Sequence, residues 1–296
     1  MWSSREMIEE YLTPKQKDYE LIDAGDGMKL ERFGDCILAR PDPEALFPRT
    51  LKESEWSKAD ARFIRKGAHT EWLVSKKIPA SWIISYGKLK LEIKPTSFKH
   101  VGLFPEQLSN WVWLEKKIKN SPNKNPKLLN LFGYTGGASL VCAQAGGEVT
   151  HVDGSKSVYG WARKNQDLSG LMDKKIKWLI DDSISFLKKE IKRGVRYDGI
   201  IMDPPSFGHG PNGELWKIEE QLVELFTLCF KALSTDPIFF LVNGYSAGYS
   251  VQTYKNNLVP LLEKHGGKIE TGELLLEIKS DSSKKLPAGI VVRWSK

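Results

Sequence analysis

Residues 129–153, LNLFGYTGGASLVCAQAGGEVTHVD, decide the fold. An apolar segment at 128–132 leads into a glycine-rich turn, which is followed by a segment of helical length (137–146) and a second apolar segment at 148–153. Short apolar segments bounded by turn residues are typical of buried strands, and strand–helix–strand is the unit that builds a parallel sheet. The stretch therefore predicts such a unit, with its glycine turn at the carboxyl end of the first strand.

The same alternation continues downstream and gives the fold class. Helix-length segments separate the next strands, a final helix is predicted near 251–264, and the last two strands lie close together in sequence. The pattern predicts an α/β fold: a Rossmann-like, seven-stranded, mostly parallel sheet with one antiparallel strand. The five further strands are predicted at 176–180, 197–202, 237–243, 268–278 and 288–294.

The residues upstream have a different pattern. Short apolar segments with glycine turns between them occupy residues 17–100 and are typical of strands. A helix is predicted over 105–120, and the two prolines of SPNKNPK (121–127) end it. We therefore predict two domains, a small β-rich domain at 1–100 and the α/β domain at 101–296.

The chain is basic, with 44 Lys and Arg against 37 Asp and Glu and a pI near 9.1, which favours a polyanionic partner. Residues 51–100 alone hold eleven Lys and Arg against five acidic residues. Basic grooves with aromatic rings are typical of single-stranded nucleic-acid sites, so the 1–100 domain is a candidate for RNA binding. The alternative is a solvated face over an aromatic core. The aromatic and nearby basic residues concerned are Trp56, Trp72, Trp82, Tyr86, Phe98, Lys116, Lys117 and Lys119.

Several classes of protein and site are disfavoured. The three cysteines form no CxxC pair and the five histidines no HExxH pattern, so neither a zinc site nor a disulfide framework is expected. No apolar run approaches the roughly 18 to 20 residues of a membrane span. The first residues are too charged for a secretory signal. We expect a soluble, cytoplasmic protein without a membrane or metal partner.

The predicted strand ends carry acids and glycines, and ligands of open α/β sheets bind there. The first strand leads into the glycine turn, which opens a helix whose N-terminus favours an anionic group. The second strand ends at Asp153, about 20 residues beyond the turn, where a carboxylate can accept both hydroxyls of a ribose. The third ends at Asp181 and Asp182, one of which can accept from an adenine amino group. The alternatives are a plain tight turn and carboxylates that only cap helices.

The fourth strand ends in MDPPSFG, residues 202–208. Two prolines fix φ and supply no backbone donors, so Asp203 is presented on a stiff segment, and Phe207 can stack on a planar ring. Alone, Asp-Pro-Pro is a common turn sequence. Together, the glycine turn, the two acidic strand ends and this segment predict one nucleoside-binding crevice.

LNLFGYTGGASLVCAQAGGEVTHVDGSK, DDSISFL and DPPSFG resemble the class I S-adenosylmethionine-dependent methyltransferases. More narrowly, they resemble the bacterial large-subunit ribosomal-RNA methyltransferases, which carry L-N-L-F-x-Y-T-G and D-P-P-x-F and a small N-terminal β-rich domain. HVGLFPEQLSNW (100–111) also resembles the F-x-x-Q segment of that group. The resemblance implies S-adenosyl-L-methionine as cofactor, ribosomal RNA as substrate and no metal.

The resemblance also implies roles for individual residues. Asp153 would hold the ribose, Asp182 would meet the adenine, and Phe104 and Gln107 would close over the cofactor. The residues that would shape the methionine side are Asn130, Phe132, Gly133, Tyr134, Thr135 and Gly136. Those that would face the target base are Asp203, Pro204, Pro205 and Phe207, with Asn243 and Tyr245 as second-choice contacts.

The departures from the family bear on the methylated atom. Cytosine C5 methylation needs a cysteine nucleophile, but the loops DPPSFGHG and VNGYSAGY contain none, and Cys142 and Cys229 fall in predicted helices. The inserted Ser206 weakens the match to the four-residue motif of amine methylation. We therefore favour direct transfer to a ring nitrogen such as guanine N7. A nicotinamide dehydrogenase, a non-catalytic RNA-binding protein, and methylation of protein or small molecules are the alternatives.

Overall fold

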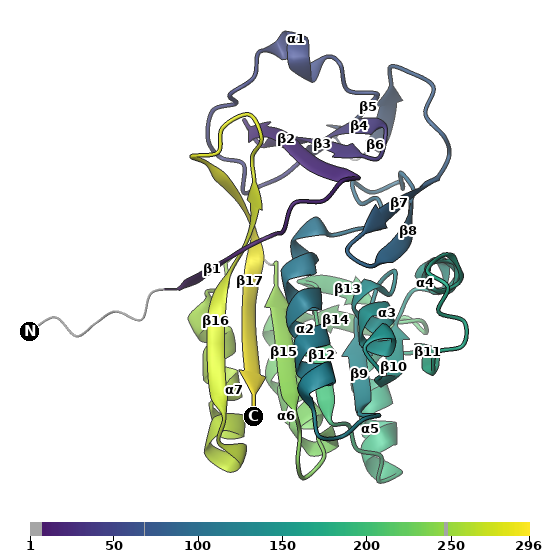
Figure 1. The fold of residues 1–296 in the computed structure, drawn as a ribbon, viewed down its shortest axis with the longest axis vertical. Helices are drawn as coiled ribbons and strands as arrows, with labels where there is room; N and C mark the ends of the chain where they lie inside the picture. The colour runs from purple at the N-terminus through teal and green to yellow at the C-terminus, as the bar shows by residue number, and fades with distance from the viewer. Residues whose placement is uncertain (1–7, 68, 246–247) are drawn as a thin grey trace, which may run out of the picture.

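The computed structural model describes residues 8–67, 69–245 and 248–296, and its main element is an eight-stranded sheet in the order β1-β16-β17-β15-β12-β9-β10-β11 (Figure 1). Only β17 runs against its neighbours, β15 and β16. The strands are β1 (Glu9–Leu12), β9 (Lys127–Leu131), β10 (Glu148–Asp153), β11 (Ile176–Ile180), β12 (Gly199–Met202), β15 (Phe239–Gly244), β16 (Lys268–Glu277) and β17 (Lys285–Ser295).

Seven of these strands are the predicted ones, and the mostly parallel sheet with one antiparallel strand is confirmed. The prediction missed the eighth, β1, which pairs in parallel with β16. Its four residues, EEYL, are mostly exposed and contain no apolar run, so no local pattern marks them as a strand. This strand also places part of the predicted 1–100 domain in the large sheet.

Helices cover both faces of the sheet because successive strand residues point to opposite sides. Ile201 packs with α2 and α3, whereas its neighbours Ile200 and Met202 pack with α5, α6 and α7. The helices are α2 (Leu108–Asn120), α3 (Gly137–Gln144), α4 (Lys156–Leu168), α5 (Ser183–Lys192), α6 (Ile218–Ala232) and α7 (Val251–His265). A short 3-10 turn, η1 (Pro105–Gln107), leads into α2.

The N-terminal region is a small β structure above one end of the large sheet (Figure 1). One hydrophobic core runs from its Phe33 and Tyr86 to Trp111 of α2 and Leu140 of α3, so the region packs on the α/β part rather than standing apart from it. Its elements are β2 (Tyr19–Gly25), β3 (Met28–Phe33), β4 (Cys36–Pro41), α1 (Glu53–Trp56), β5 (Ala61–Lys66), β6 (His69–Val74), β7 (Trp82–Tyr86) and β8 (Leu89–Ile93).

The aromatic residues of the basic window are mainly core. Trp56 and Tyr86 are fully buried, and the indole N–H groups of Trp72 and Trp82 donate to the backbone carbonyls of Thr96 and Phe33, respectively. Only Phe98 is largely exposed, at 72%. Trp56 and Tyr86 therefore match the alternative of an aromatic core, whereas Trp72 and Trp82 are only partly buried. RNA binding by this region stays a prediction.

Within the described ranges, no helix has the length and apolar character of a membrane span. The same residues contain no group of three or more His, Cys, Asp and Glu placed to hold a metal ion. Cys142 and Cys229 are buried free thiols whose pKa values are raised by burial. They are core residues, as their predicted helical positions indicate.

Candidate active site

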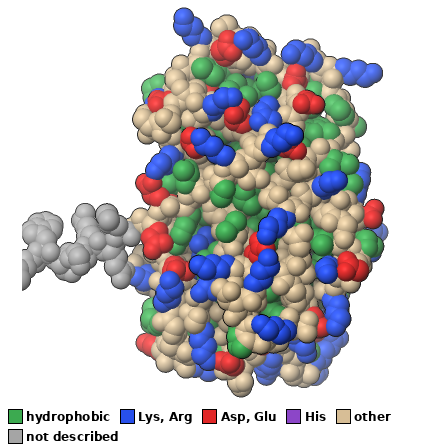
Figure 2. Space-filling view, viewed as in Figure 1, with side chains coloured by type: hydrophobic (Ala, Val, Ile, Leu, Met, Phe, Trp, Pro, Cys, Tyr) green, Lys and Arg blue, Asp and Glu red, His purple; other side chains and the backbone are tan. Residues whose placement is uncertain are grey.

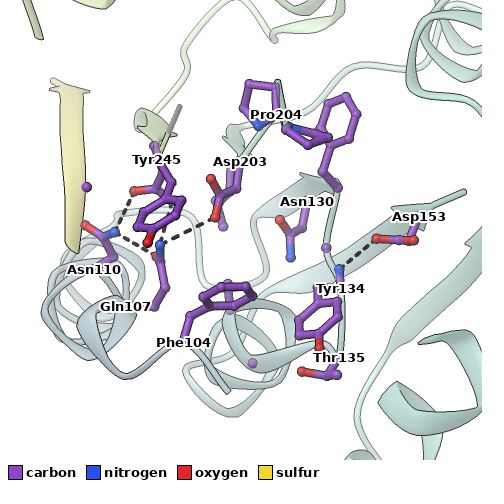
Figure 3. Close-up of a pocket in the computed structure, with 18 of the residues that line it drawn as sticks. Phe104, Gln107, Asn110, Asn130, Tyr134, Thr135, Asp153, Asp203, Pro204 and Tyr245 are labelled. Atoms are coloured by element: carbon purple, nitrogen blue, oxygen red, sulfur yellow. Dashed lines mark hydrogen bonds between the residues drawn. The ribbon is translucent and has the colours of Figure 1, made fainter. Parts of the chain in front are cut away.

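A cavity of about 440 Å³ lies at the carboxyl ends of β9, β10, β12 and β15, a volume within the range of pockets that enclose small ligands. Its wall includes most of the residues that the sequence singles out. Figure 3 shows Asp153 on one side, Asp203 and Tyr245 on the other, and Asn130 between them. The predicted crevice thus coincides with a cavity, and nucleoside binding there stays a prediction.

The glycine turn between β9 and α3 has an unusual backbone. Phe132, Tyr134 and Gly136 all adopt left-handed conformations, with φ of 55°, 49° and 88°. Such φ values are strained for residues with a Cβ and persist where the surroundings impose them. Here the backbone N–H of Tyr134 donates to the Asp153 carboxylate at 2.9 Å. Asp153 at the end of β10 therefore holds the glycine turn after β9 in its conformation.

Asp153 accepts two backbone N–H groups, from Tyr134 and from Ser155, each at 2.9 Å. Ser155, not Asp153, is the N-cap residue of α4, so the helix-cap alternative does not describe this carboxylate. Burial raises its pKa. Because a carboxylate has about four lone-pair sites, Asp153 keeps acceptor capacity toward the cavity, which suits a ribose.

Asp181 and Asp182 both border the cavity, but each has a structural partner. The Asp181 carboxylate pairs with the Lys189 ammonium at 2.8 Å. One oxygen of Asp182 accepts the backbone N–H of Ser185 at 2.8 Å and caps α5. The capping alternative is therefore correct for Asp182, which retains its second oxygen for a ligand.

Asp203 stands at the end of β12 and is the last member of a polar chain (Figure 3). The Gln107 amide nitrogen approaches its carboxylate at 3.5 Å, and Asn110 donates to the side-chain oxygens of Gln107 at 2.8 Å and of Asn243 at 2.7 Å. The Arg293 guanidinium in turn donates to the Asn110 oxygen at 2.6 Å. Burial raises the pKa of Asp203 to about 6.

Asn110 and Arg293, which orient Gln107, are site residues that the sequence did not predict. Both are buried polar residues, with exposed fractions of 1% and 3%. Two signals were available: Asn110 follows Gln107 by one helical turn, and Arg293 interrupts the otherwise apolar strand IVVRW. A lone charge in a buried strand needs a partner; the Tyr11 ring of β1, with its centroid 4.1 Å from the guanidinium carbon, supplies part of that contact.

The segment 102–107 lines one side of the cavity, and closure of Phe104 and Gln107 over the cofactor stays a prediction. The Phe104 ring lies 5.4 Å from the Tyr134 ring, centroid to centroid. The Thr135 hydroxyl donates to the Gly102 carbonyl at 2.7 Å. The structure thus brings the F-x-x-Q segment together with the glycine turn.

Phe207 does not lie with the other predicted site residues in the cavity lining. It begins a small hairpin, β13 (Phe207–His209) with β14 (Leu215–Lys217), where the sequence predicts a loop. The ring is 57% exposed, packs against His209 and lies outside the cavity lining, whereas Pro204 and Pro205 border it. Gly136 also lies outside the lining and serves as the N-cap of α3.

Tyr245 borders the cavity at its Asp203 end (Figure 3). Its hydroxyl donates to the Asp42 carboxylate at 3.4 Å, and the Lys99 ammonium lies 5.9 Å from the ring centroid. Both partners come from the N-terminal region. That region therefore positions the aromatic residue at the Asp203 end.

The start of α3 is a sensitive packing position, which gives a first prediction. A Cβ on Gly137 would lie 2.2 Å from the buried Trp111 ring, whereas a Cβ on Gly160 in α4 meets nothing within 4 Å. Gly137→Ala should lower the free energy of unfolding by about 1–3 kcal/mol through overpacking. Gly160→Ala, the matched control, should raise it by about 0.5–1 kcal/mol through helix propensity. Urea denaturation measures both; equal effects would refute the packing argument.

The comparisons with known proteins identify the family of this chain. The family model described as S-adenosylmethionine-dependent methyltransferase matches residues 57–227. The ribosomal RNA large subunit methyltransferase K/L of Shewanella sp. (strain MR-4) is 26% identical over 233 residues, which are 77% of this chain and 30% of that protein. This chain thus spans about a third of the length of the curated relatives it matches.

Solved structures show the same fold. The S-adenosylmethionine-dependent methyltransferase from Agrobacterium tumefaciens is 35% identical, with a TM-score of 0.91 over 97% of this chain and 93% of that one. A protein solved in complex with S-adenosylhomocysteine matches with a TM-score of 0.68 at 18% identity, over 95% of this chain and 76% of that one. The family match over more than half of the chain and the Agrobacterium structure together show that this chain belongs to the S-adenosylmethionine-dependent methyltransferase family.

Proposed function

We propose that this S-adenosylmethionine-dependent methyltransferase methylates a nitrogen of an RNA base, with ribosomal RNA as the substrate. The observation that carries the proposal is a single cavity with two chemically different ends. One end offers the Asp153 carboxylate and the glycine turn, and the other offers Asp203 beside Tyr245. The first suits a nucleoside cofactor and the second a planar acceptor.

The cofactor end is built to bind and orient. Asp153 receives the ribose hydroxyls, the free oxygen of Asp182 meets the adenine, and the turn at 132–136 encloses the methionine side together with Phe104. Bound S-adenosylmethionine supplies a methyl group on a positively charged sulfur. The protein's part is to hold the acceptor in line with that methyl group and to exclude water.

At the acceptor end, Asp203 orients the base by accepting a hydrogen bond, and Pro204 and Pro205 keep its backbone stiff. Tyr245 takes the stacking role that the sequence analysis gave to Phe207. A base reaches this recessed site only when it is splayed out of its stack. A loop or another single-stranded segment of RNA is therefore the expected substrate.

The charge of the molecule supports a nucleic-acid substrate. The net charge is +7, and Figure 2 shows Lys and Arg side chains across the whole of one face rather than in a single patch. A basic surface gains affinity by releasing counterions from phosphates. The relatives named as ribosomal RNA methyltransferases point the same way, which favours RNA over protein or small molecules.

The lining of the cavity supports a nitrogen acceptor over cytosine C5. Of the described residues that border it, none is a cysteine. Methylation of cytosine C5 requires a thiolate that adds to the ring, and this site provides none. A base nitrogen has its own lone pair and needs no covalent activation.

The test is transfer of radiolabelled methyl groups from S-adenosylmethionine to a lysate of cells that lack the gene for this protein. The RNA and protein fractions are separated and counted after incubation with the wild type. Label in RNA that ribonuclease releases is the expected result. Label found in protein alone, or in small molecules alone, would overturn the proposal.

A further inference from the structure

Glu106, in η1, is a buried residue whose carboxyl group has no assigned role in the site described above. It is 5% exposed and borders the cavity. In the part of the chain that the structure describes, its side chain forms no hydrogen bond or ion pair with another residue; its only such contact is with its own backbone N–H. Buried polar groups are almost always paired, and an unpaired carboxyl group is costly to bury. A ligand is the natural partner.

The surroundings place Glu106 at the acceptor end. The Tyr86 hydroxyl donates to the Pro105 carbonyl at 2.7 Å and fixes η1 from the N-terminal side. The next residue, Gln107, reaches Asp203. Charge interactions connect Glu106 with Asp203 and with Tyr245. The three side chains therefore belong to the same half of the cavity.

Among the described residues, the Glu106 carboxyl group has no ion pair, although Lys29 acts on it through space and lowers its pKa. The groups that interact with it through space are Lys29 and Glu31 of β3, Asp203 of the β12 end, Tyr86 of β7 and Tyr245. Lys29 is the sole cation among these, and its ammonium is 3.0 Å from the Asp42 carboxylate. Glu106 thus remains a free hydrogen-bond acceptor facing the cavity.

The chemistry of a free carboxylate discriminates between bases. An ionised carboxylate only accepts hydrogen bonds, and its two oxygens fit two adjacent donors. Guanine offers such a pair, N1–H beside the N2 amino group. The amino groups of adenine and cytosine lie next to acceptor ring nitrogens, and the N3–H of uracil lies between two carbonyl groups. Those acceptors would repel the second carboxylate oxygen.

We propose that Glu106 binds the N1–H and N2 amino edge of a splayed guanine, and so makes guanine the acceptor base. This inference rests on the proposed RNA methylation. In the transfer, the guanine nitrogen forms its new bond to the methyl carbon while the carbon–sulfur bond breaks and leaves its electron pair on sulfur. The positive charge thereby passes to the base, where the adjacent Glu106 carboxylate stabilises it. If the methylated nitrogen carried a hydrogen, it then releases that proton to Asp203.

The ionised form of Glu106 is the one that binds guanine, which gives a pH signature. Burial raises the pKa of Glu106 to about 7. Its carboxyl is therefore protonated below that pH in the free enzyme, and kcat/KM for RNA should fall by about tenfold per unit there. Glu106→Gln should remove this step from the profile, because an amide does not titrate.

The matched variants are Glu106→Gln and Glu115→Gln. Both replace a glutamate with its isostere within the η1–α2 segment, but Glu115 pairs with Lys88 and Lys119 at the surface and lies outside the cavity lining. Loss of a bidentate base contact should lower kcat/KM for RNA about 5- to 150-fold in Glu106→Gln. S-adenosylmethionine affinity, measured by calorimetry, should stay within about threefold, since the cofactor end is unchanged. Glu115→Gln should resemble the wild type.

The deciding experiment uses RNA from cells that lack the gene, labelled by the wild type and digested to nucleosides for mass spectrometry. Label in a methylguanosine supports the inference. Label in methyladenosine, methylcytidine or methyluridine overturns it but leaves the proposed RNA methylation standing, whereas an unlabelled RNA fraction overturns both. A Glu106→Gln variant could instead bind S-adenosylmethionine ten times more weakly, with kcat/KM for RNA and the labelled nucleoside unchanged. That result would assign Glu106 to the cofactor and would also refute the inference about guanine.

Discussion

Asp153→Ala is expected to weaken S-adenosylmethionine binding by about 100- to 10,000-fold, because it removes two charge-assisted hydrogen bonds to the ribose, each worth about 1.5–3 kcal/mol. The substitution also frees the Tyr134 and Ser155 backbone N–H groups that Asp153 now accepts. The strained turn at 132–136 then loses the contact that holds it. Isothermal titration calorimetry measures the loss.

The controls separate binding from folding. Asp153→Asn keeps one acceptor oxygen and should give an intermediate affinity. Asp173→Ala, at an exposed residue that pairs with Lys174, should bind like the wild type. Thermal denaturation without ligand shows whether Asp153→Ala is folded. Unchanged affinity in a folded Asp153→Ala protein would remove Asp153 from the cofactor site.

Asp203→Ala is expected to lower kcat for RNA methylation by about 100- to 1,000-fold, the range for loss of a preorganised contact to the reacting group. Cofactor affinity should change by less than about threefold, since Asp203 faces the acceptor. Single-turnover transfer of labelled methyl groups separates the two effects. A large fall in cofactor affinity, with normal kcat at saturation, would instead assign Asp203 to the cofactor.

Asp203→Asn tests whether methyl transfer requires the negative charge of the Asp203 carboxylate. With Glu106 and Asp203 both required as carboxylates, kcat/KM should fall by about tenfold per pH unit between pH 7 and 6, and by about a hundredfold per unit below 6. The pKa of Asp203 is raised to about 6 by burial, so the second step belongs to it. Asp203→Asn should show only the first step. A steep fall below pH 6 in this variant would contradict the assignment.

The raised pKa of Asp203 also has a consequence for stability. The folded state holds the Asp203 proton up to about pH 6, whereas the unfolded chain releases it near the ordinary aspartate pKa of 3.8. The folded protein therefore binds more protons in this window, and the contribution of Asp203 to stability falls as the pH rises through it. At pH 7 the Asp203→Asn variant should melt at a higher temperature than the wild type, whereas Asp173→Asn should not. Such a result would mean that the ionised Asp203 expected to serve methyl transfer lowers stability.

The sequence predicted the α/β sheet and the acids at its strand ends because both depend on local patterns. Apolar segments of strand length alternate with helical ones, and in parallel strands the carboxyl ends meet at one edge. Asp153 and Asp203 could therefore be placed in one crevice from strand order alone. The short strand β1 could not be predicted from the sequence, since its pairing with β16 joins residues more than 250 positions apart.

The acceptor end was less predictable because it depends on contacts between distant segments. The direction of Phe207 is set by a hairpin, and the position of Tyr245 by Asp42 and Lys99 of the N-terminal region. Glu106 stands beside a recognised segment, but its lack of a partner becomes visible only when the surrounding side chains are in place. Local motifs thus indicate the cofactor, while tertiary packing indicates the acceptor.

The central claim is that one cavity holds the cofactor at Asp153 and directs its methyl group toward Asp203. A crystal structure of the protein with S-adenosylhomocysteine tests it most directly, through the distances from the ribose hydroxyl oxygens to the Asp153 carboxylate. We expect hydrogen bonds of about 2.5–3.0 Å there, with the cofactor sulfur facing Asp203 and Glu106 still unpaired. Ribose hydroxyls that contact neither oxygen of Asp153, or a sulfur that faces away from Asp203, would contradict it.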